Sequence, residues 1–354
     1  GTFSFSSLAQ TSTDIGVWLD HLPYSNAVDV QAVGDVVYCA TEQGLFIYDN
    51  DDKSIERLSK INGLNDVGLT CIAWSNKYKT LLIGYENGNV DLVAGPTVKN
   101  VPDIRQAGNY PGLKRINRIT VDGDEAYICT EFGIVTYDLS RDIIKETFII
   151  GDQGNIVGVN DVALANDSIY AATNTGLLVA NVNDPLIFFK NWKPDPRITK
   201  KVTHVESFNN RVVANTSAPS PAFDSLFYRE GGAWKLVTQV PDSAVNLDVR
   251  ATGGQLSIAN GSSARTYNAS FNNVLNVQTG VLASQNISKK SADALLLKAA
   301  SVGKDLDFYW VASNDGLFAS IRYDGANSYQ ENITPNSPIS KSVLKMYHDD
   351  NRLF

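Results

Sequence analysis

Carboxylates near predicted turns are the side chains with the clearest potential for chemistry in this sequence. Two carboxylates on either side of a glycosidic bond can act as general acid and general base. The candidates are Asp66, Asp122, Asp124 and Asp161. The sequence does not show that any two of these carboxylates lie side by side. We therefore interpret them as polar residues of turns. A glycan-cleaving enzyme is therefore the third-ranked hypothesis.

The acidic run at residues 49–56 has the beginning of a calcium loop. An EF-hand loop needs Asp or Asn at its fifth position and Gly at its sixth, where this chain has Lys53 and Ser54. A solvated turn between two strands is the better interpretation. The nucleophile-elbow, phosphate-loop, dinucleotide-binding and HExxH motifs are absent from the sequence. We therefore predict no catalytic residue, no cofactor and no metal ligand.

The three cysteines, Cys39, Cys71 and Cys129, cannot all pair with one another, and none lies in a CxxC motif. A chain of this length builds a sufficient core without disulfides. We expect free, buried and unreactive thiols, with one disulfide or a reactive thiol as the alternative. The three histidines are scattered, and no Cys/His cluster has the spacing of a metal site.

Composition narrows the class of protein further. Of the 354 residues, 43% are hydrophobic and 19% charged, which is typical of a globular chain and excludes disorder and coiled coil. The formal net charge of −8 argues against binding to nucleic acid, because that affinity comes mainly from clustered Lys and Arg. No stretch approaches the ~18 apolar residues of a membrane-spanning helix.

A repeat of about 44 residues must position these side chains. Each copy has an alternating apolar strand, a polar turn, a second strand, a Thr-Glu-x-Gly or related turn, and a third strand that often ends at Tyr-Asp. The turn glycines that mark the copies are Gly44, Gly88, Gly133, Gly176 and Gly316. Two weaker copies fill the interval before the last of them. We expect glycine at these turns to supply a positive φ, and the Thr hydroxyl to bond nearby backbone.

The repeat predicts an all-β fold, a seven-bladed β-propeller of four-stranded antiparallel blades. A single four-stranded sheet cannot bury both faces, but such sheets packed in a ring can. A repeat of 40–50 residues is typical of propeller blades. A β-sandwich would not keep this period, and the coils of a β-helix are shorter. Seven units fit between residues 26 and 336, and we place the propeller at residues 16–340.

Both ends of the chain differ from the repeat. Residues 1–15 resemble the end of a secretory signal, or else a disordered N-terminal arm. Residues 16–22 resemble an outer strand that could complete the last blade and close the ring. Residues 341–354 restart the pattern, which predicts either the beginning of a truncated second propeller, the favoured interpretation, or a hairpin that closes this one.

One segment departs from the repeat in a way that suits a protein partner. Residues 186–197 predict an aromatic and basic outer strand that leads into a proline-rich turn. The candidate partner-binding residues on this edge are Phe188, Phe189, Trp192 and Arg197, because aromatic and Arg side chains anchor many interfaces. The alternative is an edge strand whose rings pack on the next blade.

The repeats resemble two families of propellers from Bacteroidota. Residues 63–73, with the later Glu86-Asn87-Gly88, are similar to both the sensor propellers of hybrid two-component regulators and the PorZ family. The PorZ likeness is the closer one. It rests on residues 18–22 with Asn26, 38–46, 56–64, 85–92 and 191–192.

The PorZ resemblance implies the N-terminal propeller of a cell-surface component of the type IX secretion system. It implies a non-enzymatic scaffold whose partners are proteins of the outer-membrane sortase complex, which processes and attaches cargo. The chain would then be exported to the cell surface of a Gram-negative bacterium. The alternative is a periplasmic propeller that senses a glycan for a hybrid two-component regulator.

Overall fold

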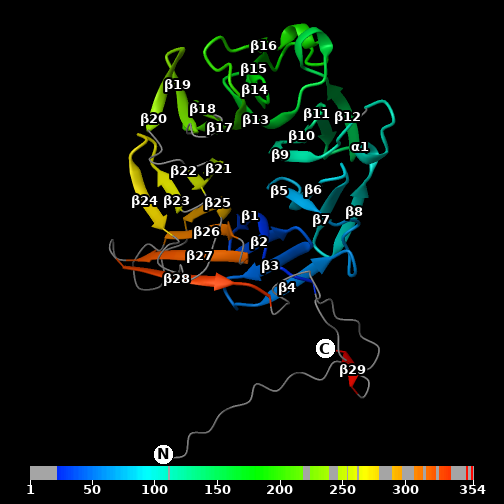
Figure 1. Cartoon of the computed structure of the whole chain (residues 1–354), viewed down its shortest axis with the longest axis vertical. Coiled ribbons are helices and arrows are strands. Elements are labelled where there is room, and N and C mark those ends of the chain that lie inside the picture. The colour runs from blue at the N-terminus through cyan, green and yellow to red at the C-terminus, as the bar shows by residue number, and fades with distance from the viewer. Residues whose placement is uncertain are drawn as a thin grey trace, which may run out of the picture.

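The computed structural model describes residues 22–110, 112–217, 224–238, 246–252, 254–260, 263–278, 289–296, 307–313, 316–323, 327–335, 348–349 and 352–353. The described strands form seven four-stranded antiparallel sheets and one two-stranded sheet. The four-stranded sheets follow one another around a common centre (Figure 1). Four consecutive strands make each sheet, so the chain completes one blade before it begins the next.

The first three blades lie at residues 27–148. The first blade contains β1 (Ala27–Val33), β2 (Val36–Thr41), β3 (Gly44–Asp49) and β4 (Ile55–Ser59). The second contains β5 (Leu69–Ser75), β6 (Thr80–Tyr85), β7 (Val90–Ala94) and β8 (Thr97–Val101), followed by the one-turn helix α1 (Asp103–Gln106). The third contains β9 (Ile116–Asp122), β10 (Glu125–Thr130), β11 (Gly133–Asp138) and β12 (Ile143–Phe148).

The next three blades lie at residues 159–278. The fourth follows the short 3-10 turn η1 (Asp152–Gly154) and contains β13 (Val159–Ala165), β14 (Ser168–Thr173), β15 (Gly176–Asn181), the 3-10 turn η2 (Phe189–Asn191) and β16 (Lys193–Pro194). The fifth contains β17 (Val202–Phe208), β18 (Arg211–Thr216), β19 (Ser225–Glu230) and β20 (Ala233–Thr238). The sixth contains β21 (Asn246–Thr252), β22 (Gln255–Asn260), β23 (Ser263–Tyr267) and β24 (Asn273–Gln278).

The last four-stranded sheet closes the ring against the first. It contains β25 (Lys289–Leu296), β26 (Asp307–Ser313), β27 (Gly316–Tyr323) and β28 (Asn327–Ile333). Strand β1 packs against β25 and β26. Trp310, Ala312 and Ile333 share a buried cluster with side chains of the first blade.

The structure corrects the prediction of a seven-bladed propeller in one respect, because the number of packed cores differs from the number of four-stranded sheets. Packed hydrophobic clusters number six in the part of the chain that the structure describes, not seven, and the six blades β1–β24 supply nearly all of their members. The blades also differ in their outer strands. Strand β16 has only two residues, because the N–H group that a longer strand would use is missing at Pro194 and Pro196. All-β architecture and four-stranded antiparallel sheets were predicted correctly.

The Thr-x-x-Gly turns are built as the sequence indicates, except in one respect. The hydroxyl of Thr41 donates to the carbonyl of Gly44 at 2.8 Å and accepts from its N–H group, and Thr130 does the same at Gly133. Gly133 has a φ of 151°, whereas Gly44 is absent from the residues with positive φ. At Gly44 a Cβ would lie 2.8 Å from the carbonyl oxygen of Leu58. Close approach of the fourth strand therefore requires glycine there, and the predicted positive φ was wrong at this turn.

The predictions for the two ends of the chain stay predictions. Residues 1–21 lie outside the described residues, and so does most of the strand that we expected to complete the last blade. The last sheet has β28 as its own outer strand. Strands β29 (His348–Asp349) and β30 (Arg352–Leu353) form the separate two-stranded sheet.

Candidate functional site

The strand nearest the centre of each blade has the same irregularity close to its beginning. A one-residue register shift occurs at Ala27/Asp29 in β1, and an equivalent shift occurs in each of β5, β9, β13, β17, β21 and β25. We call the residues that follow the first six of these bulges the inner ring. The inner ring consists of Asp29, Cys71, Arg118, Asp161, His204 and Asp248. The repeat therefore places a polar or ionisable side chain at the equivalent position of each of these six blades.

Two inner-ring aspartates connect neighbouring blades. Asp29 accepts hydrogen bonds from the N–H group of Val30 at 2.8 Å and, in the next blade, from that of Ile72 at 2.9 Å. Asp161 accepts in the same way from Val162 at 2.9 Å and from Val205 at 3.1 Å. Charged acceptors make strong bonds to backbone N–H groups. Both carboxylates thus hold the inner strands of adjacent blades together.

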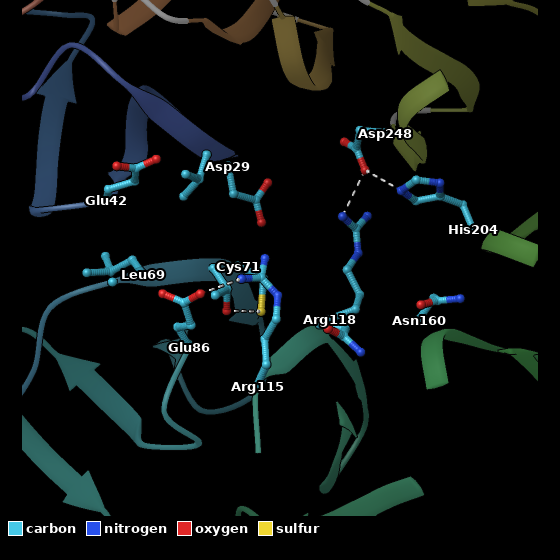
Figure 2. Close-up of a pocket in the computed structure, with 14 residues that line it drawn as sticks. Asp29, Glu42, Leu69, Cys71, Glu86, Arg115, Arg118, Asn160, His204 and Asp248 are labelled. Carbon is cyan, nitrogen blue, oxygen red and sulfur yellow. Dashed lines mark hydrogen bonds and ion pairs between the residues drawn. The ribbon is translucent and has the colours of Figure 1, made fainter. Parts of the chain in front are cut away.

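Arg118 extends across the inner ring to the opposite side. Its guanidinium donates to Asp248 at 2.8 Å, and lies 3.7 Å from Glu206 and 4.0 Å from Asp161. Figure 2 shows this side chain pointing towards Asp248, with His204 beside the same carboxylate oxygen. One largely buried cation therefore lies close to carboxyl groups from three different blades.

Arg250 makes a second cross-connection, from the sixth blade to the first. Its guanidinium donates to Asp29 at 2.6 Å and to the carbonyl of Val30. It also lies 3.7 Å from Asp248. The two arginines and the inner-ring aspartates form one ion-pair network.

Burial shifts the pKa values of the groups in this network. It raises the pKa of Glu206 well above its usual range, and the neighbouring charge of Asp161 adds to this shift. Burial also raises the pKa of Asp161, against the opposing effect of Arg118. For His204, burial lowers the pKa to about 4, so its ring is neutral at pH 7. The attraction of the carboxylates keeps the pKa of Arg118 well above its usual value, against the cost of its own burial.

The network forms part of a polar cavity of about 530 Å³. Its lining includes Arg115 and Glu86, whose side chains lie 3.7 Å apart, together with Asn117, Asn160 and His204. Figure 2 shows Glu86, Arg115, Asn160 and His204 around it. Such a cavity offers hydrogen-bonding groups to a small polar ligand.

The structure does not bring the four predicted carboxylates together. Only Asp161 belongs to the inner ring. Asp66 lies in the β4–β5 connection, where it accepts hydrogen bonds from Arg105 and Asn87. Asp124 lies in the β9–β10 turn and pairs with Lys77 at 2.6 Å, and Asp122 is exposed at the end of β9.

The acidic run and the three cysteines, which the sequence also suggested as chemical candidates, have structural roles. The acidic run at residues 49–56 includes the turn between β3 and β4, as predicted, and its Asp49 and Asp52 side chains accept from backbone N–H groups of the turn. Cys39, Cys71 and Cys129 are buried free thiols, as predicted. Burial raises the pKa of Cys71 to about 12. No group of three His, Cys, Asp or Glu side chains suited to a metal ion occurs among the described residues.

The predicted aromatic outer strand at residues 186–197 is not a strand over most of its length. The chain forms η2 at Phe189–Asn191, and only Lys193–Pro194 pairs with β15, opposite Val179 and Leu178. The side chain of Trp192 donates to the carbonyl of Leu186 at 2.9 Å, which closes the segment into a compact loop. Local hydrogen bonding and proline prevent a longer outer strand.

The four predicted edge residues have different environments. Trp192 is only 4% exposed and packs against Phe148 of the third blade. Phe188 is 60% exposed. Phe189 is half-buried, with its ring 3.3 Å from the position that a Cβ of Gly154 would take, and Arg197 is exposed. Trp192 thus packs on the preceding blade and not on the next one, and partner binding through these residues stays a prediction.

A second cavity of about 690 Å³ lies beside these residues, and we call it the blade-four groove. Its walls come from the β12–β13 connection, the beginning of β15 and the η2–β17 segment. The lining is mainly apolar and includes Ile150, Ile156, Leu177, Phe189, Trp192 and Ile198. One wall of this groove is the segment at residues 186–197, which was recognised from the sequence. The other wall, at residues 150–157, was not predicted.

The inner ring was also missed. Its members recur at intervals of 42–47 residues, close to the period of the turn glycines. An alignment of the repeats on the bulge position would have revealed it. Searches for catalytic motifs could not, because the residue type changes from blade to blade.

Four-stranded blades around a centre, each with a bulged inner strand, define the chain as a β-propeller. Residues 37–193 match the family model "TSS9, PorZ, N-terminal beta-propeller domain". The predicted resemblance to the PorZ family is therefore confirmed for this part of the chain. The match includes residues 150–157, 175–178 and 189–193 of the blade-four groove.

A solved structure supports the same fold. The chain is similar to PorZ of Porphyromonas gingivalis, which is described as an essential bacterial surface component of the type IX secretion system. The similarity covers 96% of this chain and 42% of that one, with 17% sequence identity and a TM-score of 0.75. The chain thus spans less than half the length of PorZ. The comparison with curated proteins gives no match.

Within the described residues, no helix has the length and apolar character needed to cross a membrane.

Proposed function

We propose that this chain is a non-enzymatic, protein-binding propeller of a type IX secretion component at the cell surface. In this proposal it supports the sortase-type complex that processes secreted cargo and attaches it to the outer membrane. The match of residues 37–193 to the PorZ N-terminal propeller carries the proposal. The printed description of the P. gingivalis protein as a surface component supports the location.

The geometry of the inner ring supports a structural use of its carboxylates. Asp29 and Asp161 each accept two backbone N–H bonds that connect adjacent blades, and Asp248 pairs with Arg118. These groups stabilise the ring by joining neighbouring and opposite blades. Binding through surfaces at the periphery leaves this network intact.

A deletion in the native bacterium tests the proposal. The gene is replaced by a version that lacks residues 22–335, and the export and surface attachment of cargo are measured. We expect cargo with uncleaved sorting signals to accumulate and surface attachment to be lost. Normal export and attachment, with the shortened protein present at the surface, would refute the proposal.

The polar cavity at the inner ring favours a second candidate function, a propeller that senses a small glycan. Its mixed lining of Arg115, Asn117, Asn160 and Glu86 suits a ligand with many hydroxyl groups. A glycan array with the purified chain tests this candidate. Specific binding that is lost in Asn160→Ala supports it, and the absence of any retained glycan counts against it.

A further inference from the structure

The segment after η2 carries an unusual concentration of positive charge. Residues 190–201 contain five cations and one acidic residue, in a chain with a formal net charge of −8. The cations are Lys190, Lys193, Arg197, Lys200 and Lys201. All five are exposed, and none of their side chains has an ion pair or hydrogen bond among the described residues. The charge is therefore available to a partner.

The acidic residue of the segment does not neutralise these cations. Asp195 is buried and accepts hydrogen bonds from the N–H groups of Arg197 and Ile198. Its other carboxylate oxygen accepts from the indole N–H of Trp234 at 2.9 Å. These bonds fix the turn that presents Lys193 and Arg197 on the outside.

The same segment borders an apolar depression. Lys190 and Lys193 line the blade-four groove together with Ile156, which is 47% exposed. Ile187 and Phe188, directly before η2, are 51% and 60% exposed. Exposed apolar residues beside a concave surface with charged borders are typical of interaction sites. The groove volume of about 690 Å³ is sufficient for a large apolar side chain.

We propose that the blade-four groove binds an extended acidic segment of a partner protein, which anchors one large apolar side chain in the groove. Carboxylates of that segment pair with the cations of residues 190–201. The apolar anchor contacts Ile156 and Phe189. The choice of a protein occupant rests on the proposed function, while the acidic and apolar character comes from the groove itself.

Selection from a random peptide library displayed on phage tests the chemistry. The immobilised full chain is the target, and synthetic versions of the enriched peptides are titrated by fluorescence anisotropy. We expect enriched peptides to contain several Asp or Glu residues beside one Phe, Trp or Leu. We expect about ten-fold weaker binding to the double variant Lys190→Glu/Lys193→Glu, because each reversed charge replaces an attraction with a repulsion.

Two further variants provide matched controls. Ile156→Asp places a charge in the groove and should weaken binding similarly, whereas Ile143→Asp changes an exposed apolar residue of β12 that does not line the groove. Lys53→Glu reverses an exposed cation in the β3–β4 turn and should leave binding unchanged. Unchanged thermal unfolding midpoints establish that each variant is folded.

Other outcomes would overturn the proposal. The proposal fails if the selection enriches no peptide, or if the enriched peptides are basic or lack an apolar anchor. It also fails if the groove variants bind the peptides as tightly as the control variants do. Expression of Lys190→Glu/Lys193→Glu in the native bacterium separates this proposal from the proposed function. If the variant supports normal cargo export while deletion of residues 22–335 does not, the groove proposal fails and the proposed function stands.

Discussion

Replacement of Arg118 by methionine tests whether the cross-ring network stabilises the propeller. The side chain of Arg118 is 14% exposed and faces Asp161, Glu206 and Asp248 at 2.8–4.0 Å. Removal of one partner from a buried ion pair leaves the other charge uncompensated, which costs about 3–5 kcal/mol. Methionine keeps much of the volume, so cavity formation adds little. We expect a loss of about 3–5 kcal/mol in the free energy of unfolding at pH 8.

The pH dependence of this loss distinguishes charge from packing. Burial and mutual repulsion already raise the pKa values of Glu206 and Asp161, and without Arg118 both must rise further. The folded variant then takes up protons at pH 5, which relieves the uncompensated charge. We therefore expect the destabilisation to be smaller at pH 5 than at pH 8.

Urea denaturation followed by circular dichroism at both pH values measures the effect. Lys77→Met serves as the control, because the pair between Lys77 and Asp124 is exposed to solvent and should contribute nothing measurable. The reasoning is refuted if Arg118→Met costs no more than this control. It is also refuted if the loss is as large at pH 5 as at pH 8.

Three further perturbations test other features of the ring. His204 has a folded-state pKa of about 4, below the usual 6.5, so it stabilises the fold above pH 6.5 and this contribution disappears as the pH falls through 4. When the free energy of unfolding is plotted against pH, His204→Asn should therefore reduce the slope on the acidic side by up to about 1.4 kcal/mol per pH unit. An unchanged slope would contradict the assignment. Gly133→Ala places a Cβ 2.2 Å from the carbonyl oxygen of Phe148, and we expect it to lower the free energy of unfolding in urea by about 3 kcal/mol. The control Gly123→Ala should cost about 1 kcal/mol, because its Cβ meets nothing within 4 Å. The three buried cysteines should react with a thiol reagent only in denaturant, and rapid labelling of the native chain would show that a thiol is accessible.

The blades could be predicted from the sequence because hairpin turns restrict residue type. Gly133 needs both its conformation and the space beside Phe148, and Thr130 satisfies the backbone of the same turn. These requirements recur in most copies, so the repeat remains visible where the strands have diverged. The differences between blades could not be predicted, because a shared turn fixes neither the length of an outer strand nor the packing beside it.

The candidate sites were less accessible to sequence reasoning. Side chains of the inner ring interact across the ring, so Arg118 and Asp248 complement each other without sharing a residue type or a local motif. The blade-four groove combines residues 150–157 with residues 186–199, which the chain brings together only after the whole fourth blade has formed. The aromatic residues in one wall were recognisable, but the turn at Pro194 and the burial of Trp192 depend on tertiary contacts.

The long-range arginine contacts have a consequence for how the chain folds. Most strand pairs join neighbours in sequence, so individual blades can form early with little loss of chain entropy. The bond from Arg250 to Asp29 spans 221 residues and exists only once the sixth blade has come round to the first. Ring closure therefore adds its stabilisation in one late step. A nascent chain still emerging from the ribosome or the export channel lacks that contribution, so the unfinished propeller remains easy to unfold until its last blades arrive.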